Sequence, residues 1–177
     1  MQKKCILSAQ EITRTLERLA YEIIERHGDC EKLALVGIQR RGVDVAARLR
    51  EVLSARLGKK VPLGSLDINL YRDDWTSLDS QPMINKTEFP FSVDEAEIVL
   101  VDDVLFTGRT IRSALEAILD YGRPRRVELL VLVDRGHREL PIHADYVGKM
   151  VNTGRDEHVN VLVTERDGED AVVLLQN

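Results

Sequence analysis

The chain has 177 residues, a length that fits a single domain with a sizeable hydrophobic core. Hydrophobic residues make up 44% of the chain and charged residues 31%, and the formal net charge of −5 argues against a uniformly basic nucleic-acid-binding protein. No apolar run approaches the roughly 18 residues of a membrane span, and the polar N-terminus is unlike a signal peptide.

The first part of the chain alternates helical and strand patterns. Ser8 and Glu11 have the spacing of a capping box, and apolar residues then recur at helical spacing. Further on, residues 32–38 form a continuous apolar run, 43–58 are amphipathic, and 65–72 alternate apolar and polar residues. These patterns predict a helix over 9–27, a buried strand over 32–38, a helix over 43–58 and a strand over 65–72.

Residues 73–92 have no periodicity and contain two prolines, which is typical of a functional loop. Regular patterns then resume. They predict a strand over 97–103, a helix over 108–122, a strand over 126–134, and a C-terminal hairpin made of 158–165 and 171–175.

This alternation predicts one α/β domain over 1–177. We expect a mainly parallel central sheet flanked by helices, finished by an antiparallel C-terminal hairpin. In such sheets ligands bind beyond the carboxyl ends of the strands. Charged turns fall at three such ends, over 39–42, 102–110 and 134–139, so we expect the functional site there.

The segment EIVLVDDVLFTGRT places Asp102 and Asp103 at the end of an apolar strand and a small-residue turn after them. Carboxylates accept hydrogen bonds from sugar hydroxyls or help to hold a hydrated Mg²⁺. The start of a helix favours an anion through its free N–H groups and its dipole. The pattern predicts a ribose 5-phosphate, with its phosphate on Val104, Leu105, Phe106, Thr107, Gly108, Arg109 and Thr110.

The segment GIQRRG forms a second candidate site. Arg40 and Arg41 precede Gly42 on a turn that follows a buried strand. Arginines on such a turn suit a diphosphate, because a guanidinium makes charge-assisted and bidentate hydrogen bonds to phosphate.

The segment VLVDDVLFTGRT resembles the phosphoribosyl-pyrophosphate (PRPP) signature of type I phosphoribosyltransferases. The segments LYRDD (70–74), GRP (122–124) and VLVDRGHRELPIHADYVGK (131–149) extend the resemblance to the PyrR family of pyrimidine operon attenuators and uracil phosphoribosyltransferases. It covers the chain from the first predicted helix to about residue 155. It implies a type I phosphoribosyltransferase fold, a flexible active-site loop at about 72–90, and a small hood at about 134–155 with part of the N-terminus.

The family implies two activities: synthesis of UMP from uracil and PRPP, and binding of pyrimidine operon leader mRNA when UMP or UTP is bound. The resemblance makes Asp102 and Asp103 the catalytic carboxylates, with Mg²⁺ held mainly by PRPP and water. The family's diphosphate turn often carries a non-proline cis peptide. The remaining expected ligand-binding residues are Arg72 and Lys86 in the flexible loop, and Arg135, Met150 and Val151 around uracil.

The family's RNA-facing surface is basic, and its matching positions here are Arg18, Arg26, His137, Arg138 and Lys149. Glu17 and His143 depart from the family pattern and make this surface less positive.

Two other functions fit the same residues: a phosphoribosyltransferase for another base, such as hypoxanthine or orotate, and an RNA-binding regulator with negligible catalysis. Purine enzymes generally carry a lysine near the position of Asp134, and its absence here favours a pyrimidine. Cys5 and Cys30 lie far apart in no metal-ligand pattern, so we expect reduced thiols in a cytoplasmic protein. Family members are dimers or tetramers, and we expect a homodimer or homotetramer.

Overall fold

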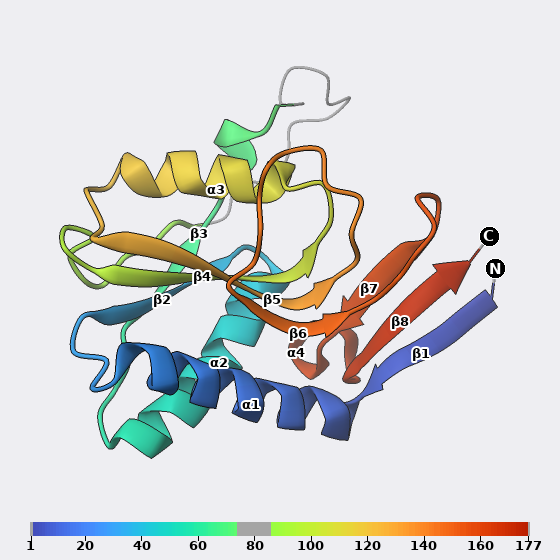
Figure 1. The fold of residues 1–177 in the computed structure, drawn as a ribbon, viewed down its shortest axis with the longest axis horizontal. Coiled ribbons are helices and arrows are strands. Elements are labelled where there is room, and N and C mark those ends of the chain that lie inside the picture. The colour runs from blue at the N-terminus through green and yellow to red at the C-terminus, as the bar shows by residue number, and fades with distance from the viewer. Residues whose placement is uncertain (1, 74–85, 177) are drawn as a thin grey trace.

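The structure is a computed structural model and describes residues 2–73 and 86–176. In this part of the chain, a five-stranded sheet has the order β3-β2-β4-β5-β6, and a three-stranded sheet has the order β1-β8-β7 (Figure 1). All neighbours in the larger sheet are parallel and those in the smaller sheet are antiparallel. The predicted α/β class, parallel sheet and C-terminal hairpin are confirmed.

The strands of the larger sheet are β2 (Leu33–Ile38), β3 (Leu63–Leu66), β4 (Glu97–Leu105), β5 (Arg126–Asp134) and β6 (Tyr146–Met150). Those of the smaller sheet are β1 (Gln2–Ser8), β7 (His158–Leu162) and β8 (Ala171–Gln176). A short helix, α4 (Thr164–Asp167), connects β7 to β8.

Helices cover both faces of the larger sheet. Helices α1 (Ala9–His27) and α2 (Arg41–Leu57) pack against one face, and α3 (Arg109–Leu119) packs against the other (Figure 1). Apolar strand residues such as Leu35 and Leu100 are fully buried between these layers. Strands buried on both faces explain why their sequences are continuous apolar runs.

Helix α1 begins as its sequence predicts. The Glu11 N–H donates to the Ser8 hydroxyl at 3.3 Å, and the Ser8 N–H donates to Glu11 Oε2 at 2.8 Å, which completes the capping box. Gly28 follows the helix at a φ of 66°, a conformation that glycine adopts without steric cost.

The strand predicted over 65–72 is confirmed only at its first two residues and is wrong beyond Leu66. Strand β3 ends at Leu66, and a 3₁₀ turn, η1 (Asn69–Tyr71), follows it. The Asp67 side chain accepts a hydrogen bond from the Asn69 N–H at 2.9 Å, and this local bond turns the chain out of the sheet. Leu70 is consequently 61% exposed, although its position in the alternating pattern had suggested a buried residue.

Two strands were not predicted. Strand β1 pairs with β8, and β6 lies beside β5 as the edge strand of the larger sheet. The predicted hood region, 134–155, therefore contributes one strand to the central sheet. That these residues cover the base stays a prediction.

Most of the predicted flexible loop, residues 74–85, lies outside the described residues. Cys5 is exposed and Cys30 buried, and both are free thiols. In residues 2–73 and 86–176, no helix is long and apolar enough to cross a membrane.

Candidate active site

An open cavity of about 440 Å³ lies at the carboxyl edge of the larger sheet. It joins segments that are far apart in the sequence: the turn before α2, the end of β3, and the end of β4 with the start of α3. The lining residues are Ile38, Gln39, Arg40, Arg41, Asp67, Ile68, Asn69, Arg72, Asp102, Asp103, Val104 and Thr110. The predicted diphosphate turn, the aspartate pair and part of the predicted phosphate turn thus share one cavity.

The aspartate pair is held at the end of β4 by its own backbone. Asp102 is 7% exposed, and its Oδ1 accepts a hydrogen bond from the Asp103 N–H at 2.9 Å. The Asp103 carboxylate in turn accepts one from the Val104 N–H at 2.9 Å. These bonds fix both carboxyl groups at the cavity wall.

The two carboxyl groups are held in an unfavourable environment. Burial, and then the neighbouring Asp103, raise the pKa of Asp102 well above its ordinary value. Burial also raises the pKa of Asp103, against the hydrogen bond with Asp102 and the nearby charge of Arg41. Shifted pKa values of carboxyl groups in a cleft cluster at sites that bind ligands or do chemistry, which makes this pair a candidate site.

The turn before α2 has the expected shape. Its Gln39–Arg40 peptide is cis, as the family resemblance implied. Gly37 and Gly42 flank it because the backbone is too close for a side chain. A Cβ on Gly37 would lie 2.5 Å from Val43 Cα, and one on Gly42 would lie 2.6 Å from the Val101 carbonyl oxygen.

The turn before α3 is shaped by Gly108, which has a φ of 92° and directly precedes the helix. The Thr107 hydroxyl accepts a hydrogen bond from the Arg109 N–H at 3.3 Å. The Thr107 carbonyl accepts the N–H groups of Glu139 and Leu140, at 2.9 and 3.2 Å. The third charged turn therefore packs directly on the predicted phosphate turn.

Arg109 lies beside a second cavity of about 270 Å³ that shares Ile68, Arg72 and Thr110 with the first. Its guanidinium pairs with Asp73 at 2.9 Å and with Glu139 at 3.1 Å.

The expected base-binding residues divide into two environments. Arg135 is 5% exposed, its guanidinium carbon lies 3.9 Å from the centre of the Phe106 ring, and it donates to the Gly154 carbonyl at 3.0 Å. Burial lowers the pKa of Arg135. The Val151 N–H donates to the Asp134 carbonyl, whereas the Met150 side chain is 75% exposed. Arg135 thus adjoins the phosphate turn, and Met150 faces solvent.

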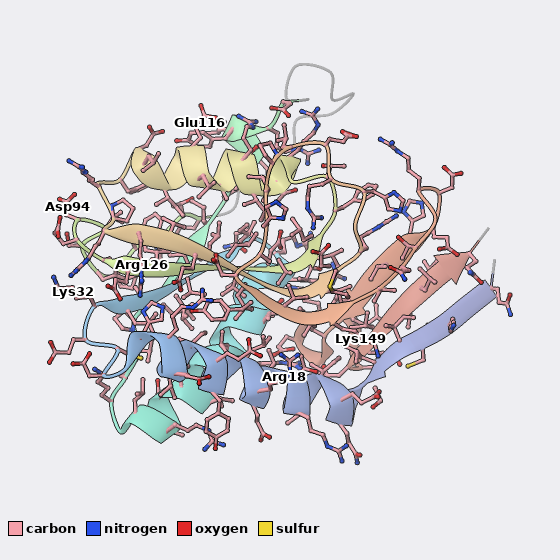
Figure 2. The ribbon with its side chains drawn as sticks, in the orientation of Figure 1. Arg18, Lys32, Asp94, Glu116, Arg126 and Lys149 are labelled. Carbon is pink, nitrogen blue, oxygen red and sulfur yellow. The ribbon has the colours of Figure 1, made fainter. Side chains whose placement is uncertain are left out.

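The five expected RNA-facing residues do not form one group. Arg18 on α1 donates to the Gly148 carbonyl of β6 at 2.5 Å, beside Lys149 (Figure 2). Arg26, two turns further along α1, lies with its guanidinium carbon 4.8 Å from the centre of the Tyr146 ring, also on β6. Arg18, Arg26 and Lys149 therefore share the exposed junction of α1 and β6.

His137 and Arg138 lie instead in the loop that packs on the phosphate turn. The Arg138 guanidinium donates to the carbonyls of Phe106 and Ile142 and to the Asp134 carboxylate, at 2.7, 3.0 and 2.6 Å. His137 Nε2 lies 2.6 Å from the Thr153 carbonyl oxygen. The structure gives both side chains contacts that hold this loop, a role that the sequence did not indicate.

Asp67 and Asn69 line the cavity but were not among the predicted site residues. Polar residues directly after β3 were the available signal, and the prediction of a strand through residue 72 concealed it. Lys86 lies at the far side of the undescribed segment, where its backbone carbonyl accepts a hydrogen bond from the Gln39 side chain at 3.3 Å.

Residues 3–166 match the family model of the phosphoribosyl transferase domain. The chain is 53% identical over 173 residues to a bifunctional protein PyrR of Syntrophobacter fumaroxidans, covering 98% of this chain and 93% of the relative. It is 55% identical over 175 residues to a bifunctional protein PyrR of Pelotomaculum thermopropionicum, covering 99% and 97%.

Solved structures with a similar fold include a hypoxanthine phosphoribosyltransferase of Trypanosoma cruzi, with a TM-score of 0.75 and 18% identity, covering 98% of this chain and 91% of that chain. Another is a hypoxanthine phosphoribosyltransferase of Staphylococcus aureus, with a TM-score of 0.69 and 22% identity, covering 98% and 92%. At such identities the likeness shows the type I phosphoribosyltransferase fold and does not choose the base.

Proposed function

The chain belongs to the phosphoribosyl transferase domain family and to its PyrR proteins, and from this membership we propose a bifunctional regulator and enzyme. As an enzyme it makes UMP and diphosphate from uracil and PRPP. As a regulator it binds the leader mRNA of pyrimidine genes when a uridine nucleotide occupies the same site.

One observation carries the enzymatic half: the aspartate pair, the diphosphate turn and the start of the phosphate turn line a single cavity. A ribose 5-phosphate with a diphosphate on its anomeric carbon has groups that match these three parts. Its hydroxyls suit the carboxylates of Asp102 and Asp103. Its 5-phosphate suits the turn before α3, and its diphosphate suits the turn before α2.

The proposed reaction needs no covalent nucleophile. The bond from the anomeric carbon to diphosphate breaks and positive charge develops on the sugar. A uracil nitrogen then forms the new bond to that carbon, and the proton of this nitrogen is released. Asp102 and Asp103 hold the ribose hydroxyls and lie where a carboxylate stabilises that positive charge, while Arg40 and Arg41 lie beside the departing diphosphate. Positioning and charge stabilisation of this kind supply most of the rate enhancement in such a reaction.

Mg²⁺ is the expected cofactor, and when bound it would neutralise charge on PRPP. In the described part of the chain, no group of three or more histidine, cysteine or acidic side chains is arranged to hold a metal ion. Two adjacent carboxylates at the cavity wall suit an ion whose other ligands are phosphate oxygens and water. Asp102 and Asp103 are therefore the residues that we propose for contact with it.

The base assignment rests on the third charged turn. We place uracil near Arg135 and the backbone of Met150 and Val151, beside the phosphate turn. A panel of uracil, hypoxanthine and orotate with PRPP and Mg²⁺ tests it, with UMP formation as the expected result. Turnover of hypoxanthine but not of uracil would contradict the assignment, and turnover of no base would leave a regulator without catalysis.

The regulatory half rests on Arg18, Arg26 and Lys149 at the junction of α1 and β6. We expect Lys149→Gln to weaken binding to a pyrimidine leader hairpin roughly 3- to 10-fold, with less salt dependence, because one phosphate contact is lost. The exposed Lys60 lies before β3, away from β6, and Lys60→Gln is the matched control. Wild-type affinity no better than for a random hairpin, with and without UMP, would contradict RNA recognition.

We also propose that the protein is a homodimer or homotetramer in the cytoplasm. Light scattering, which measures the molar mass in solution, tests the oligomeric state.

A further inference from the structure

Helix α2 is joined to the connection between β7 and β8 by a row of charged contacts. Arg41, Asp44 and Arg48 lie three and four residues apart, which places them on one face of the helix. Facing them are the charged residues of α4 and the turn after it. The pairs are Arg41 with Asp167, Asp44 with Arg166, and Arg48 with both Glu165 and Asp170.

The last of these contacts anchors the row. The Arg48 guanidinium donates two hydrogen bonds to Glu165, at 2.9 and 2.5 Å, and two to Asp170, at 3.0 and 2.7 Å. The hydrogen bonds from Arg48, reinforced by N–H and O–H donors of Thr164, lower the pKa of Asp170 to about 2. A bidentate, partly buried arrangement is the kind of ion pair that fixes geometry.

The order of charges makes the contact specific. Along α2 the charges run positive, negative, positive, and the facing residues carry the opposite sign at each step. Sliding the turn by one contact along the helix would bring like charges together, which is unfavourable. The row therefore sets the position of residues 164–170, here called the C-terminal turn, relative to the first residues of α2.

The end of the row reaches the diphosphate turn. Arg41 lines the main cavity, and its Nη2 donates to Asp167 at 2.8 Å. The Arg166 Nη2 lies on the same turn and donates to the Arg40 carbonyl at 3.3 Å. Both arginines of the GIQRRG segment thus have a contact with α4.

We propose that the C-terminal turn positions the diphosphate-binding turn. Asp167 holds the guanidinium of Arg41 at the cavity edge, and Arg166, itself held by Asp44, holds the backbone carbonyl of Arg40. Asp167 and Arg166 act through other residues, so they are positioning residues. The inference rests on the proposed function, because it assigns the diphosphate of PRPP to this turn.

Asp167→Asn separates positioning from folding. One Asp167 oxygen accepts the Val163 N–H at 2.8 Å, and the other accepts from Arg41. An asparagine oxygen keeps the bond to Val163, while its amide nitrogen faces the guanidinium and cannot accept from it. Glu169→Gln is the matched control, because Glu169 lies on the same turn, is exposed, and forms an ion pair at 3.6 Å with Lys3 of β1 rather than with α2.

The experiment is steady-state kinetics of UMP formation by wild type, Asp167→Asn, Asp167→Glu and Glu169→Gln, together with inhibition by inorganic diphosphate. In Asp167→Asn we expect KM for PRPP and the inhibition constant of diphosphate to rise together by roughly 3- to 10-fold. KM for uracil and the thermal midpoint stay near wild type. Asp167→Glu restores part of the loss, and Glu169→Gln behaves as wild type.

An unchanged or lower KM for PRPP in Asp167→Asn would overturn the inference, as would equal rises in KM for PRPP and for uracil. Wild-type protein that makes no UMP would instead contradict the proposed function. Arg166→Gln gives an independent variant for the same measurements, with the same expected change in KM for PRPP.

Discussion

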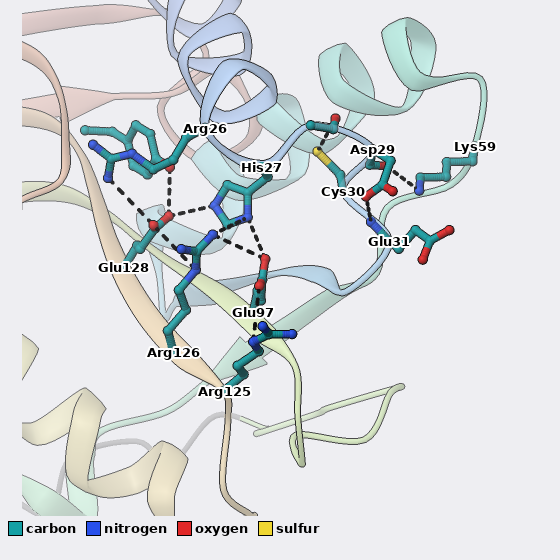
Figure 3. Close-up of polar contacts among 12 residues, drawn as sticks. Arg26, His27, Asp29, Cys30, Glu31, Lys59, Glu97, Arg125, Arg126 and Glu128 are labelled. Atoms are coloured by element: carbon teal, nitrogen blue, oxygen red, sulfur yellow. Dashed lines mark hydrogen bonds and ion pairs between the residues drawn. The ribbon is translucent and has the colours of Figure 1, made fainter.

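The two edges of the larger sheet both carry buried carboxylates, but in opposite electrostatic settings. At the amino edge, His27 Nδ1 lies 2.9 Å from Glu97 and Nε2 lies 2.8 Å from Glu128, and the His27 side chain is 1% exposed (Figure 3). Tyr146 donates to Glu128 at 2.7 Å, and Arg126 lies 3.3 Å from Glu97. Each carboxylate there has partners within the chain.

The pKa directions separate the two edges. A hydrogen bond with His27 lowers the pKa of Glu97, despite burial. Burial disfavours the charged form of Glu128, but hydrogen bonds with Tyr146 and His27 outweigh it and lower the pKa. At the carboxyl edge burial raises the pKa of both Asp102 and Asp103.

The contrast indicates a division of work. We infer that the carboxylates compensated by the chain stabilise the fold, and that those at the cavity await the hydroxyls and the cation of the proposed ligand. Substitutions that remove a charge or its partner at the amino edge are therefore expected to lower stability and spare catalysis. Substitutions of the aspartates at the carboxyl edge are expected to lower catalysis and spare stability.

The largest effect is expected at the amino edge, from His27→Ala. Removing the buried imidazole takes a hydrogen-bond partner from the buried Glu128 and from the partly buried Glu97. Breaking a buried pair in this way costs about 3–5 kcal/mol of the free energy of unfolding. Denaturant unfolding measures it, with the exposed His158→Ala as the control. A loss of kcat without a loss of stability would break the comparison.

Asp103→Asn tests the carboxyl edge. We expect kcat/KM for UMP synthesis to fall about 10²-fold, equivalent to about 2.7 kcal/mol of transition-state stabilisation. The thermal midpoint stays at or above that of wild type, because a desolvated charge is removed. The exposed Asp156→Asn serves as control, and full activity in Asp103→Asn would refute the assigned role.

Gly42→Ala sharpens the comparison by disturbing the cavity without changing a charge. The added Cβ would lie 2.6 Å from the Val101 carbonyl oxygen and 3.2 Å from Asp102 Cα, so α2 and β4 must separate. We expect a stability loss of about 1–3 kcal/mol and a rise of roughly tenfold in KM for PRPP. If Gly42→Ala had the kinetic constants of wild type, the close approach of α2 to β4 would not be needed for PRPP binding.

The smallest effect is a pH dependence at the amino edge. Because the pKa of Glu97 is lower in the folded chain, its charge stabilises the fold above the unfolded value of 4.5, and this contribution disappears as pH falls below it. Glu97→Gln is therefore less stable than wild type at about pH 6.5, and the difference shrinks toward about pH 3.5. Thermal unfolding across this range tests the sign, and a difference that grows toward acid would contradict it.

The sequence predicts the central elements well because their signals are local. The capping box of Ser8 and Glu11 begins α1, and the apolar runs of β2 and β5 are strands. Strand β1 is mostly exposed and exists through its pairing with β8, and β6 is short and depends on β5. A pairing with a distant partner leaves little trace in a strand's own residues.

The site shows the same limit. The aspartate pair and the two arginines lie at the ends of predicted strands. The rule that ligands bind beyond the carboxyl ends of parallel strands therefore predicts them from the sequence. Arg138 has the charge of an RNA contact, a role that stays a prediction, and only its folded position reveals that it also binds Asp134 and two carbonyls. The partnership of Arg41 with Asp167 spans 126 positions and has no local signal.

The most direct test of the division between the two edges is thermal unfolding of Asp102→Asn and wild type near pH 7.5, with and without PRPP and Mg²⁺. Since the raised pKa of Asp102 means that its ionised form destabilises the free fold, we predict a higher midpoint for Asp102→Asn without ligand. With ligand, the stabilisation of wild type exceeds that of the variant. A lower midpoint for the variant without ligand would contradict the account.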